Sequence, residues 1–380
     1  MQQLYQIKNN KASLLEKFGM YYLNFFKKFS KANIVFTYTD EVIAKKVTTI
    51  NLVGILLASL VGALCVYPTV WVDIYLAKAP FFIHYGWVGI VTVVSIAIEL
   101  YFLFIIALRS VYKVSLLINL NASESDLVHN GLFSIKNILA RTALELPDPE
   151  MKLMGIDPFK RVSKKNLLLL SIIYKGKIFL TNILSKYFLL YFVGNAIMGI
   201  SILYFAILVE CFWNSVVIIR VVKEARLRLF GFALANQIGS NFINDGMIEK
   251  LSPLTKKNCL RAIGNAVVMT QNYHPNMVIL FIKFQQMLKI TEVEQYDNWD
   301  MFVSALQNAS EPERYFLLDL FTVAAAFDGK LSTIENNNWA QAYGIHAALY
   351  TTRLHALTKY LQSGKLHAAL AECKLNFTAG

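Results

Sequence analysis

Two long apolar stretches and one longer apolar block organise the 380-residue chain. The first runs from Val47 to about Val70 and the second from about Tyr85 to Leu108, so each is long enough for a helix to cross a bilayer. The connection between them carries little charge and several aromatic residues, which is typical of a turn at a membrane surface. The pattern therefore predicts a first transmembrane hairpin over residues 47–113.

The second apolar block, residues 166–221, predicts a second hairpin with spans near 177–195 and 197–219. One long helix would place the basic clusters before and after this block on opposite sides of the membrane, whereas a hairpin places both on the same side. Three lysines interrupt the first of these spans, and one of them, Lys186, would lie in or near the membrane. Such a lysine needs a partner, or a position from which its amine reaches the surface.

Outside the hairpins the apolar runs shorten, charges return and the apolar positions keep a helical spacing. The expected segments are an N-terminal segment over 1–46, a connecting helical segment over 114–165 and a helical domain over 222–380, all on the cytoplasmic side. Strand-like alternation of useful length is absent from the sequence. The predicted fold class is therefore all-α: a polytopic membrane protein with about four transmembrane helices in two hairpins and a helical cytoplasmic domain.

An amphipathic helix is predicted over residues 13–30, where an aromatic face is bordered by lysines. Ser13 and Glu16 are spaced as a capping box at its start. Two interpretations remain open. Either the helix lies on an anionic membrane surface, or its aromatic face packs on the protein's own soluble domain.

Composition supports the membrane assignment, because 56% of the residues are hydrophobic and 16% are charged, whereas a soluble domain carries about 25% charge. Basic residues, which give a net charge of +12, gather at the ends of apolar runs, and this places those ends in the cytoplasm. We therefore expect a bacterial inner-membrane protein with both termini cytoplasmic. Its expected partners are the lipid bilayer and either another protein or a second copy of the chain. Nucleic acid is not expected, because no groove-like pattern of basic and aromatic residues appears.

Two glutamates lie inside apolar stretches, and each is followed ten residues later by an arginine: Glu99 by Arg109, and Glu210 by Arg220. Ten helical residues span about 15 Å, which predicts both carboxyl groups near the membrane midplane. A lone carboxylate there is unfavourable by at least a few kcal/mol, so it must be protonated, paired or directed into a wet cavity. Glu99 and Glu210 are therefore expected to face protein.

Two roles for these glutamates remain open. They form a proton or cation site between the hairpins, or they stabilise helix packing by pairing with Lys186, Asn195, Asn214 or backbone groups. A separate packing signal lies in the first span, where Gly54, Ala58 and Gly62 stand four residues apart. Such a stripe of small residues permits close approach of another helix.

The stretch "YFLLDLFTVAAAFDGKLSTIENNNW" (Tyr315–Trp339) combines an alanine-rich apolar helix, an Asp-Gly turn and a Ser-x-x-Glu helix start. It resembles the central helix–turn–helix of the TerB-like domains of tellurite-resistance proteins, and the resemblance covers about residues 311–375. In that family the acidic residues of this turn are candidate metal contacts, so the resemblance implies a divalent cation at Asp328 and Glu335. Alternatively, Asp328 turns the chain, and Ser332 and Glu335 cap the next helix.

A readable catalytic motif is absent, because the chain contains no Walker A loop, GxGxxG, HExxH or GxSxG sequence. An enzyme is therefore not the first expectation. We expect a membrane-tethered sensor or scaffold, acting in envelope or metal stress through its helical TerB-like cytoplasmic domain. The alternative is a cation- or proton-linked transporter or channel that uses Glu99 and Glu210. The proportions favour the first, because about half the chain is cytoplasmic and four spans are few for alternating access.

Overall fold

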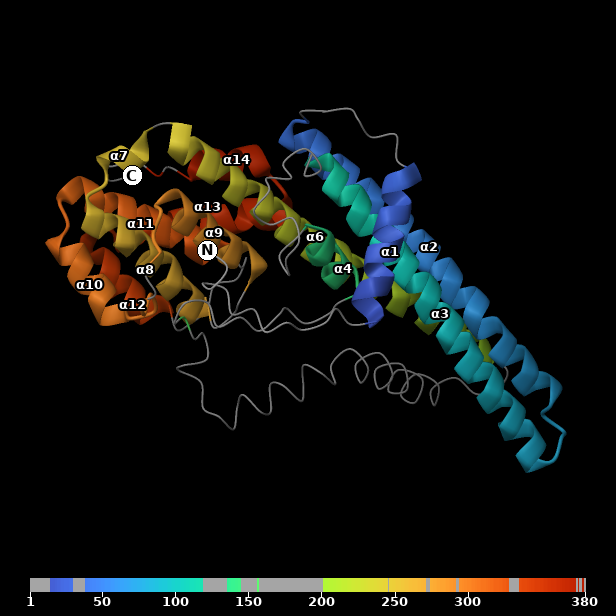
Figure 1. The fold of residues 1–380 in the computed structure, drawn as a ribbon. Coiled ribbons are helices and arrows are strands. Elements are labelled where there is room, and N and C mark those ends of the chain that lie inside the picture. The colour runs from blue at the N-terminus through green and yellow to red at the C-terminus, as the bar shows by residue number, and fades with distance from the viewer. Residues whose placement is uncertain are drawn as a thin grey trace.

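The computed structural model of this chain describes most of the predicted helical segments. The described residues are 14–29, 38–118, 135–144, 156, 201–244, 246–270, 274–291, 294–327, 335–373, 375 and 378. Every regular element among them is a helix, so the all-α fold class is confirmed for the described part of the chain. Figure 1 shows an elongated bundle of long helices that continues into a compact domain of shorter ones.

The bundle contains α1 (Leu14–Phe29), α2 (Asp40–Tyr75), α3 (Phe81–Leu117), α4 (Ile135–Ala143) and the first half of α6 (Ser201–Asn244). The helical domain contains the second half of α6 with shorter helices. These are α7 (Met247–Lys250), α8 (Pro253–Thr270), α9 (Pro275–Met287), α10 (Trp299–Asn308), α11 (Glu311–Ala326), α12 (Glu335–Tyr343), the 3₁₀ turn η2 (Gly344–His346), α13 (Ala347–Ser363) and α14 (Leu366–Glu372).

Helices α2 and α3 pack side by side and correspond to the first predicted hairpin. Within the described residues, they are the two helices identified as long and apolar enough to cross a membrane. In the most apolar 18-residue segment of each helix, only 22% of the residues are buried. Large apolar side chains are exposed from Leu52 to Tyr75 on α2 and from Phe81 to Phe102 on α3. We call this surface the apolar band; on a water-soluble protein it would be unusually large.

The second predicted hairpin is described only in part. Its first span, near 177–195, lies outside the described residues, and most of its second span falls in α6. Within the described residues two helices are clear candidate spans, where the sequence predicts four over the whole chain. The predicted boundary between residues 221 and 222 lies inside α6, which crosses it without interruption.

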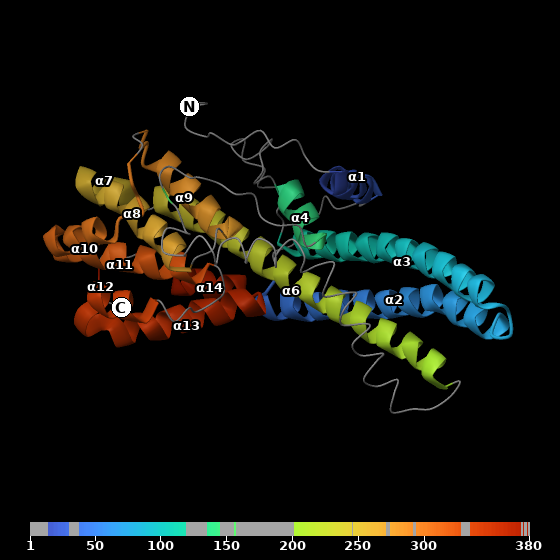
Figure 2. The ribbon, with the colours of Figure 1, turned by 90° about the horizontal axis from the view of Figure 1, so that it is seen from below.

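Helix α6 joins the two parts of the molecule. Its 44 residues extend about 66 Å. Its first half packs on α2 and α3, and its second half packs on α9, α13 and α14, as both ribbon views show (Figures 1 and 2). Buried apolar residues follow α6 through the junction, from Ile218 to Ile238. One helix thus contributes to the core of both parts.

The core of the helical domain is built around α11, which is buried along nearly its whole length from Phe316 to Phe327. It packs between α8 and α13. Local capping fixes the ends of neighbouring helices: Asn298 accepts a hydrogen bond from Met301 N at 3.1 Å at the start of α10. The α9 cap is His274, followed by Pro275 at the first helical position, where the missing N–H is not needed.

Helix α1 corresponds to the predicted amphipathic helix, and its aromatic face packs mainly on α3 and α4. Tyr22 and Tyr101 share a hydrogen bond of 2.5 Å between their hydroxyls. The rings of Phe26 and Tyr112 lie 6.0 Å apart. Figure 2 shows α1 and α4 beside α3, on the side away from α2. The interpretation in which this face packs on the domain over 222–380 is therefore not supported.

Candidate functional site

Polar side chains lie along the contact between α2, α3 and α6. We call them the polar seam; its members are Ser59, Glu99, Glu210, Cys211, Asn214 and Ser215. The residues next to Glu99 in the sequence of α3 are apolar and exposed, whereas Glu99 itself is only 3% exposed. It shares its helix face with Leu103, Ile106 and Ser110, all buried, which is the spacing of one inward helical stripe. The helical register therefore turns this carboxyl group into the bundle, as the sequence predicted.

Asn214 on α6 is the observed partner of Glu99. Its amide nitrogen donates to Glu99 Oε1 at 2.7 Å and to the Ala58 carbonyl at 3.3 Å. Asn214 is 1% exposed, so both bonds lie in a closed interface. One amide group thereby joins side chain and backbone groups from three helices.

Small polar groups continue the seam between α2 and α6. Ser59 Oγ and Ser215 Oγ lie 2.8 Å apart. Cys211 Sγ donates to the Ser59 carbonyl at 3.2 Å, and Ser59 Oγ donates to the Cys211 carbonyl at 3.3 Å. These three residues were not among the site residues predicted from the sequence. The signal was present, because small polar side chains inside apolar runs frequently bond across helix pairs.

The small-residue stripe on α2 lies at its contact with α6. A Cβ atom at Gly62 would lie 2.7 Å from Asn214 Nδ2, and one at Gly54 would lie 2.9 Å from Ile218 Cγ2. Ala58, between them, is fully buried. Any larger side chain at these positions would force the helices apart and lengthen the hydrogen bonds of the seam.

Glu210 belongs to the same seam as Glu99. It stands one turn before Asn214 on α6, and its carbonyl group would lie 3.2 Å from a Cβ atom at Gly62. The residue is half-buried, whereas Glu99 is fully buried. The two glutamates that the sequence singled out therefore occupy neighbouring levels of one helix contact.

Glu99 lies near one end of the apolar band on α3. The apolar band on α3 ends at Phe102, and α3 is buried again from Leu103 onward. Eighteen residues separate Phe81 from Glu99, a rise of about 27 Å, and only about 4.5 Å separates Glu99 from Phe102. Arg109 lies seven residues beyond Phe102, on a part of α3 that also contacts α1 and α4, and it is exposed. The position of Glu99 near the membrane midplane stays a prediction.

Three other predicted site residues are not placed by the structure. Lys186 and Asp328 lie outside the described residues, and Glu335 begins α12 with a side chain that is not described. Among the residues that the structure describes, no group of three or more His, Cys, Asp or Glu side chains could hold a metal ion. The divalent cation implied by the TerB-like resemblance stays a prediction.

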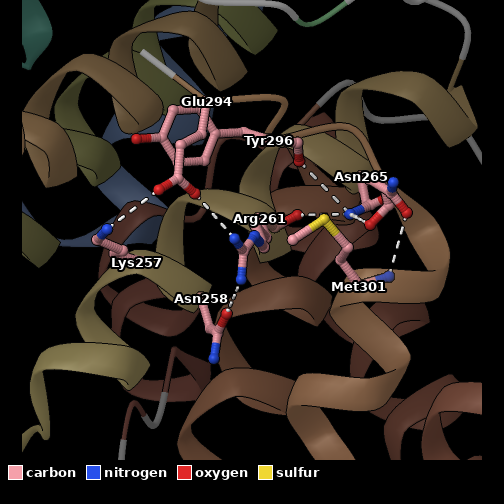
Figure 3. Close-up of polar contacts among 8 residues, drawn as sticks. Lys257, Asn258, Arg261, Asn265, Glu294, Tyr296 and Met301 are labelled. Carbon is pink, nitrogen blue, oxygen red and sulfur yellow. Dashed lines mark hydrogen bonds and ion pairs between the residues drawn. The ribbon is translucent and has the colours of Figure 1, made fainter. Parts of the chain in front are cut away.

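The helical domain contains a polar cluster that was not predicted from the sequence (Figure 3). Glu294 accepts hydrogen bonds from Lys257 Nζ at 3.0 Å and from Arg261 Nη2 at 2.8 Å. Arg261 Nη1 also donates to Asn258 Oδ1 at 2.8 Å. The bond from Lys257, aided by both positive charges, holds the pKa of Glu294 below its usual value. Both cations attract the carboxylate, so the cluster holds Glu294 on α8.

A buried ion pair connects three helices of the domain. Asp319 on α11 is fully buried and pairs with Arg353 on α13. Arg353 also donates through Nε and Nη2 to the Glu372 carbonyl of α14, at 2.9 and 2.8 Å. All of these groups lie away from the apolar band, so we assign them to the stability of the domain.

A second connection between bundle and domain lies at the start of α2. Asp40 accepts hydrogen bonds from the backbone N–H groups of His367 and Ala368, at 3.1 and 3.0 Å, and its Oδ1 lies 3.0 Å from the His367 ring. Partial burial raises the pKa of Asp40, but these hydrogen bonds outweigh it and hold the pKa below its usual value. The first residue of α2 is therefore fastened to α14.

Comparisons with protein families, with curated proteins and with solved structures found no match to this chain.

Proposed function

We propose that this protein is a membrane-tethered sensor or scaffold, whose helical domain binds a partner at the cytoplasmic face of a bacterial inner membrane. The observation that carries the proposal is α6, one helix that packs in the bundle and in the core of the helical domain. A displacement of α6 in one core must repack the other, because closely packed interiors transmit strain. The connection of Asp40 to α14 supports the same coupling.

The apolar band supports membrane insertion of α2 and α3. We propose that α6 is a third span, since its residues 202–219 contain Glu210 as their one charged side chain and expose Leu208 and Phe212. A fourth span within residues 166–200 would complete the two predicted hairpins. Lys45 and Lys46 near the start of α2, with Arg109 near the end of α3, favour a cytoplasmic position for the end that carries the helical domain.

We further propose that residues 311–375 form a TerB-like module. The helices expected on either side of its Asp-Gly turn are supported by α11 and α12. A role in envelope or metal stress, with a divalent cation at Asp328 and Glu335, rests on this resemblance. The expected partner is another protein or a second copy of the chain.

The alternative function is proton- or cation-linked transport. It is favoured by one observation, the placement of Glu99 and Glu210 along the same buried seam. Against it, Glu99 accepts a hydrogen bond from Asn214 in a closed contact between three helices. A carboxyl group that holds helices together in this way suits packing better than ion passage.

A Glu99→Gln/Glu210→Gln double variant distinguishes the two proposed functions. Glutamine keeps an acceptor for Asn214, so the variant is expected to fold with a loss of less than about 1 kcal/mol. Glu99→Leu removes the acceptor and is expected to destabilise the bundle by about 1–3 kcal/mol. Proton and cation flux is then measured in vesicles that contain the purified protein. We expect no flux above empty vesicles for either the wild type or the double variant; flux in the wild type that the double variant lacks would overturn the proposal.

The proposed orientation is tested with protease-sensitive tags in intact spheroplasts. Tags at residue 1, between residues 145 and 150, and at residue 380 are expected to stay protected from external protease. A tag between residues 76 and 80, in the turn between α2 and α3, is expected to be cut. The opposite pattern would reverse the orientation and contradict the argument from the basic residues.

A further inference from the structure

Helix α1 has an exposed face on the side away from its contacts with α3 and α4. Lys17, Tyr21, Phe25 and Lys28 follow one another at intervals of four, four and three residues, which places them on one helical face. Tyr21 is 66% and Phe25 is 46% exposed, and both lysines are exposed. We call these four residues the α1 stripe. It has an aromatic centre with one lysine on either side.

The opposite face of α1 is fully engaged by the bundle. Leu23 is buried, and a Cβ atom at Gly19 would lie only 2.8 Å from the Ala140 Cβ of α4. Phe18 packs against Tyr101, with 6.0 Å between ring centroids. These contacts hold one face of α1 on the bundle. Tyr21 and Phe25 also pack edge-on against Tyr22, with 5.3 and 6.4 Å between ring centroids, yet each keeps a large exposed area that requires an explanation.

The position of α1 along α3 supplies that explanation. Its aromatic residues meet Tyr101, at the end of the apolar band, and Tyr112, which lies beyond it. The basic residues Arg109 and Lys113 belong to the same stretch of α3. The α1 stripe is therefore continuous with the apolar band and stands at its border, where the headgroups of an inserted protein's lipids would lie.

The charge of this border is positive. The single acidic residue of α1, Glu16, is buried and paired with Arg141 of α4, so its charge is compensated within the protein. The exposed charged side chains of α1 are all lysines. Partial burial lowers the pKa of Lys113, and the neighbouring Arg109 lowers it further.

We propose that the α1 stripe binds anionic phospholipid headgroups at the border of the apolar band, with the rings of Tyr21 and Phe25 at the headgroup boundary and the amines of Lys17 and Lys28 on lipid phosphates. Exposed aromatic rings between lysines fit a lipid interface, because rings partition to the headgroup boundary while amines reach the phosphates. The proposal rests on the membrane insertion described above. It adds a specific lipid-binding element that holds the N-terminal helix against α3.

The test uses the full-length protein in membranes of equal parts phosphatidylcholine and phosphatidylglycerol. A photoreactive benzoylphenylalanine replaces Tyr21 in one variant and Phe82 in another, since Phe82 lies in the apolar band and is 88% exposed. Both positions are expected to crosslink lipid. Position 21 is expected to enrich phosphatidylglycerol over phosphatidylcholine relative to position 82, because the lysines select the anionic headgroup.

Adding Lys17→Gln and Lys28→Gln is expected to lower that enrichment, on the order of fivefold for each lysine. Lys250→Gln with Lys359→Gln is the matched control, because these exposed lysines lie on the helical domain, and it is expected to change nothing. Lipid at position 82 but none at 21 would overturn the inference while membrane insertion stands. A protein crosslink at position 21, or enrichment that survives the loss of Lys17 and Lys28, would also overturn it. Lipid at neither position would overturn both proposals.

Discussion

Replacing Arg353 with methionine is expected to destabilise the helical domain by about 3–5 kcal/mol, because Asp319 would stay buried without its counter-charge. The substitution also removes both hydrogen bonds to the Glu372 carbonyl, so α14 loses these polar contacts with α13. Urea unfolding of the detergent-solubilised protein measures the loss. Hydrogen exchange in α11, α13 and α14 locates it in the domain.

Two further variants separate this effect from a general loss of packing. Asp319→Leu/Arg353→Met removes both charges and is expected to recover most of the lost stability, since apolar residues can replace a buried pair at little cost. Lys359→Met changes an exposed residue on the same helix, and a change within about 0.5 kcal/mol is expected. If Arg353→Met cost less than about 1 kcal/mol, Asp319 would not be a buried carboxylate that depends on this arginine.

The long apolar helices were predictable from the sequence because their pattern has few physical solutions. A run of about twenty apolar residues must be buried or face lipid, and the chain between Val47 and Leu108 offers two such runs. The inward position of Glu99 followed from the cost of a carboxylate in lipid, and Asn214 was among its expected partners. The stripe of Gly54, Ala58 and Gly62 predicted a close helix contact, but it did not predict which helix would make that contact.

The continuity of α6 could not be predicted in the same way. Charges return at Arg220, and a change of composition at that point is typical of a domain boundary. The helix nevertheless continues, because apolar residues from Val221 to Leu234 keep facing a core, now that of the helical domain. A helical spacing of apolar residues indicates that one face of the helix is buried. It does not indicate which element covers that face.

Long-range polar pairs were missed for a related reason. A charged residue inside an apolar helix, such as Asp319, indicates a buried partner but not its identity, and Arg353 lies 34 residues away. The Glu294 cluster depends on how a loop folds back on α8, which no local pattern specifies. The contacts of α1 and α4 with α3 are likewise tertiary features that no local pattern specifies.

The polar seam and the shared helix together suggest how the two parts of the molecule communicate. The seam fixes the level and rotation of α6 against α2, because the bonds of Asn214 and the Ser59–Ser215 contact allow one register. The same helix carries Ala225, Leu229 and Phe230 into the domain core. A change in the bundle that rotated α6 would therefore reposition the helical domain. This coupling is what a membrane-tethered sensor requires.

Gly62→Leu is expected to separate α6 from α2 and to disrupt the seam. The new side chain would meet Asn214 and the Glu210 backbone, and backbone cannot move aside as a flexible side-chain end can. The expected loss is about 3 kcal/mol or more, together with the Asn214 bonds to Glu99 and Ala58. Gly86→Leu is the matched control, because a Cβ atom at Gly86 has no neighbour within 4 Å and faces the space around the band.

Two measurements distinguish these glycine variants. Thermal unfolding in detergent should show a lower midpoint for Gly62→Leu, by about 5–10 °C, and a nearly unchanged one for Gly86→Leu. Disulfide formation between Ser59→Cys and the native Cys211 reports the α2–α6 contact in membranes, since Cys211 Sγ lies 3.2 Å from the Ser59 carbonyl. Gly62→Leu should reduce its yield and Gly86→Leu should not. Equal yields and equal midpoints for the two variants would show that α6 does not pack on the stripe of Gly54, Ala58 and Gly62, and the proposed coupling through α6 would fail with it.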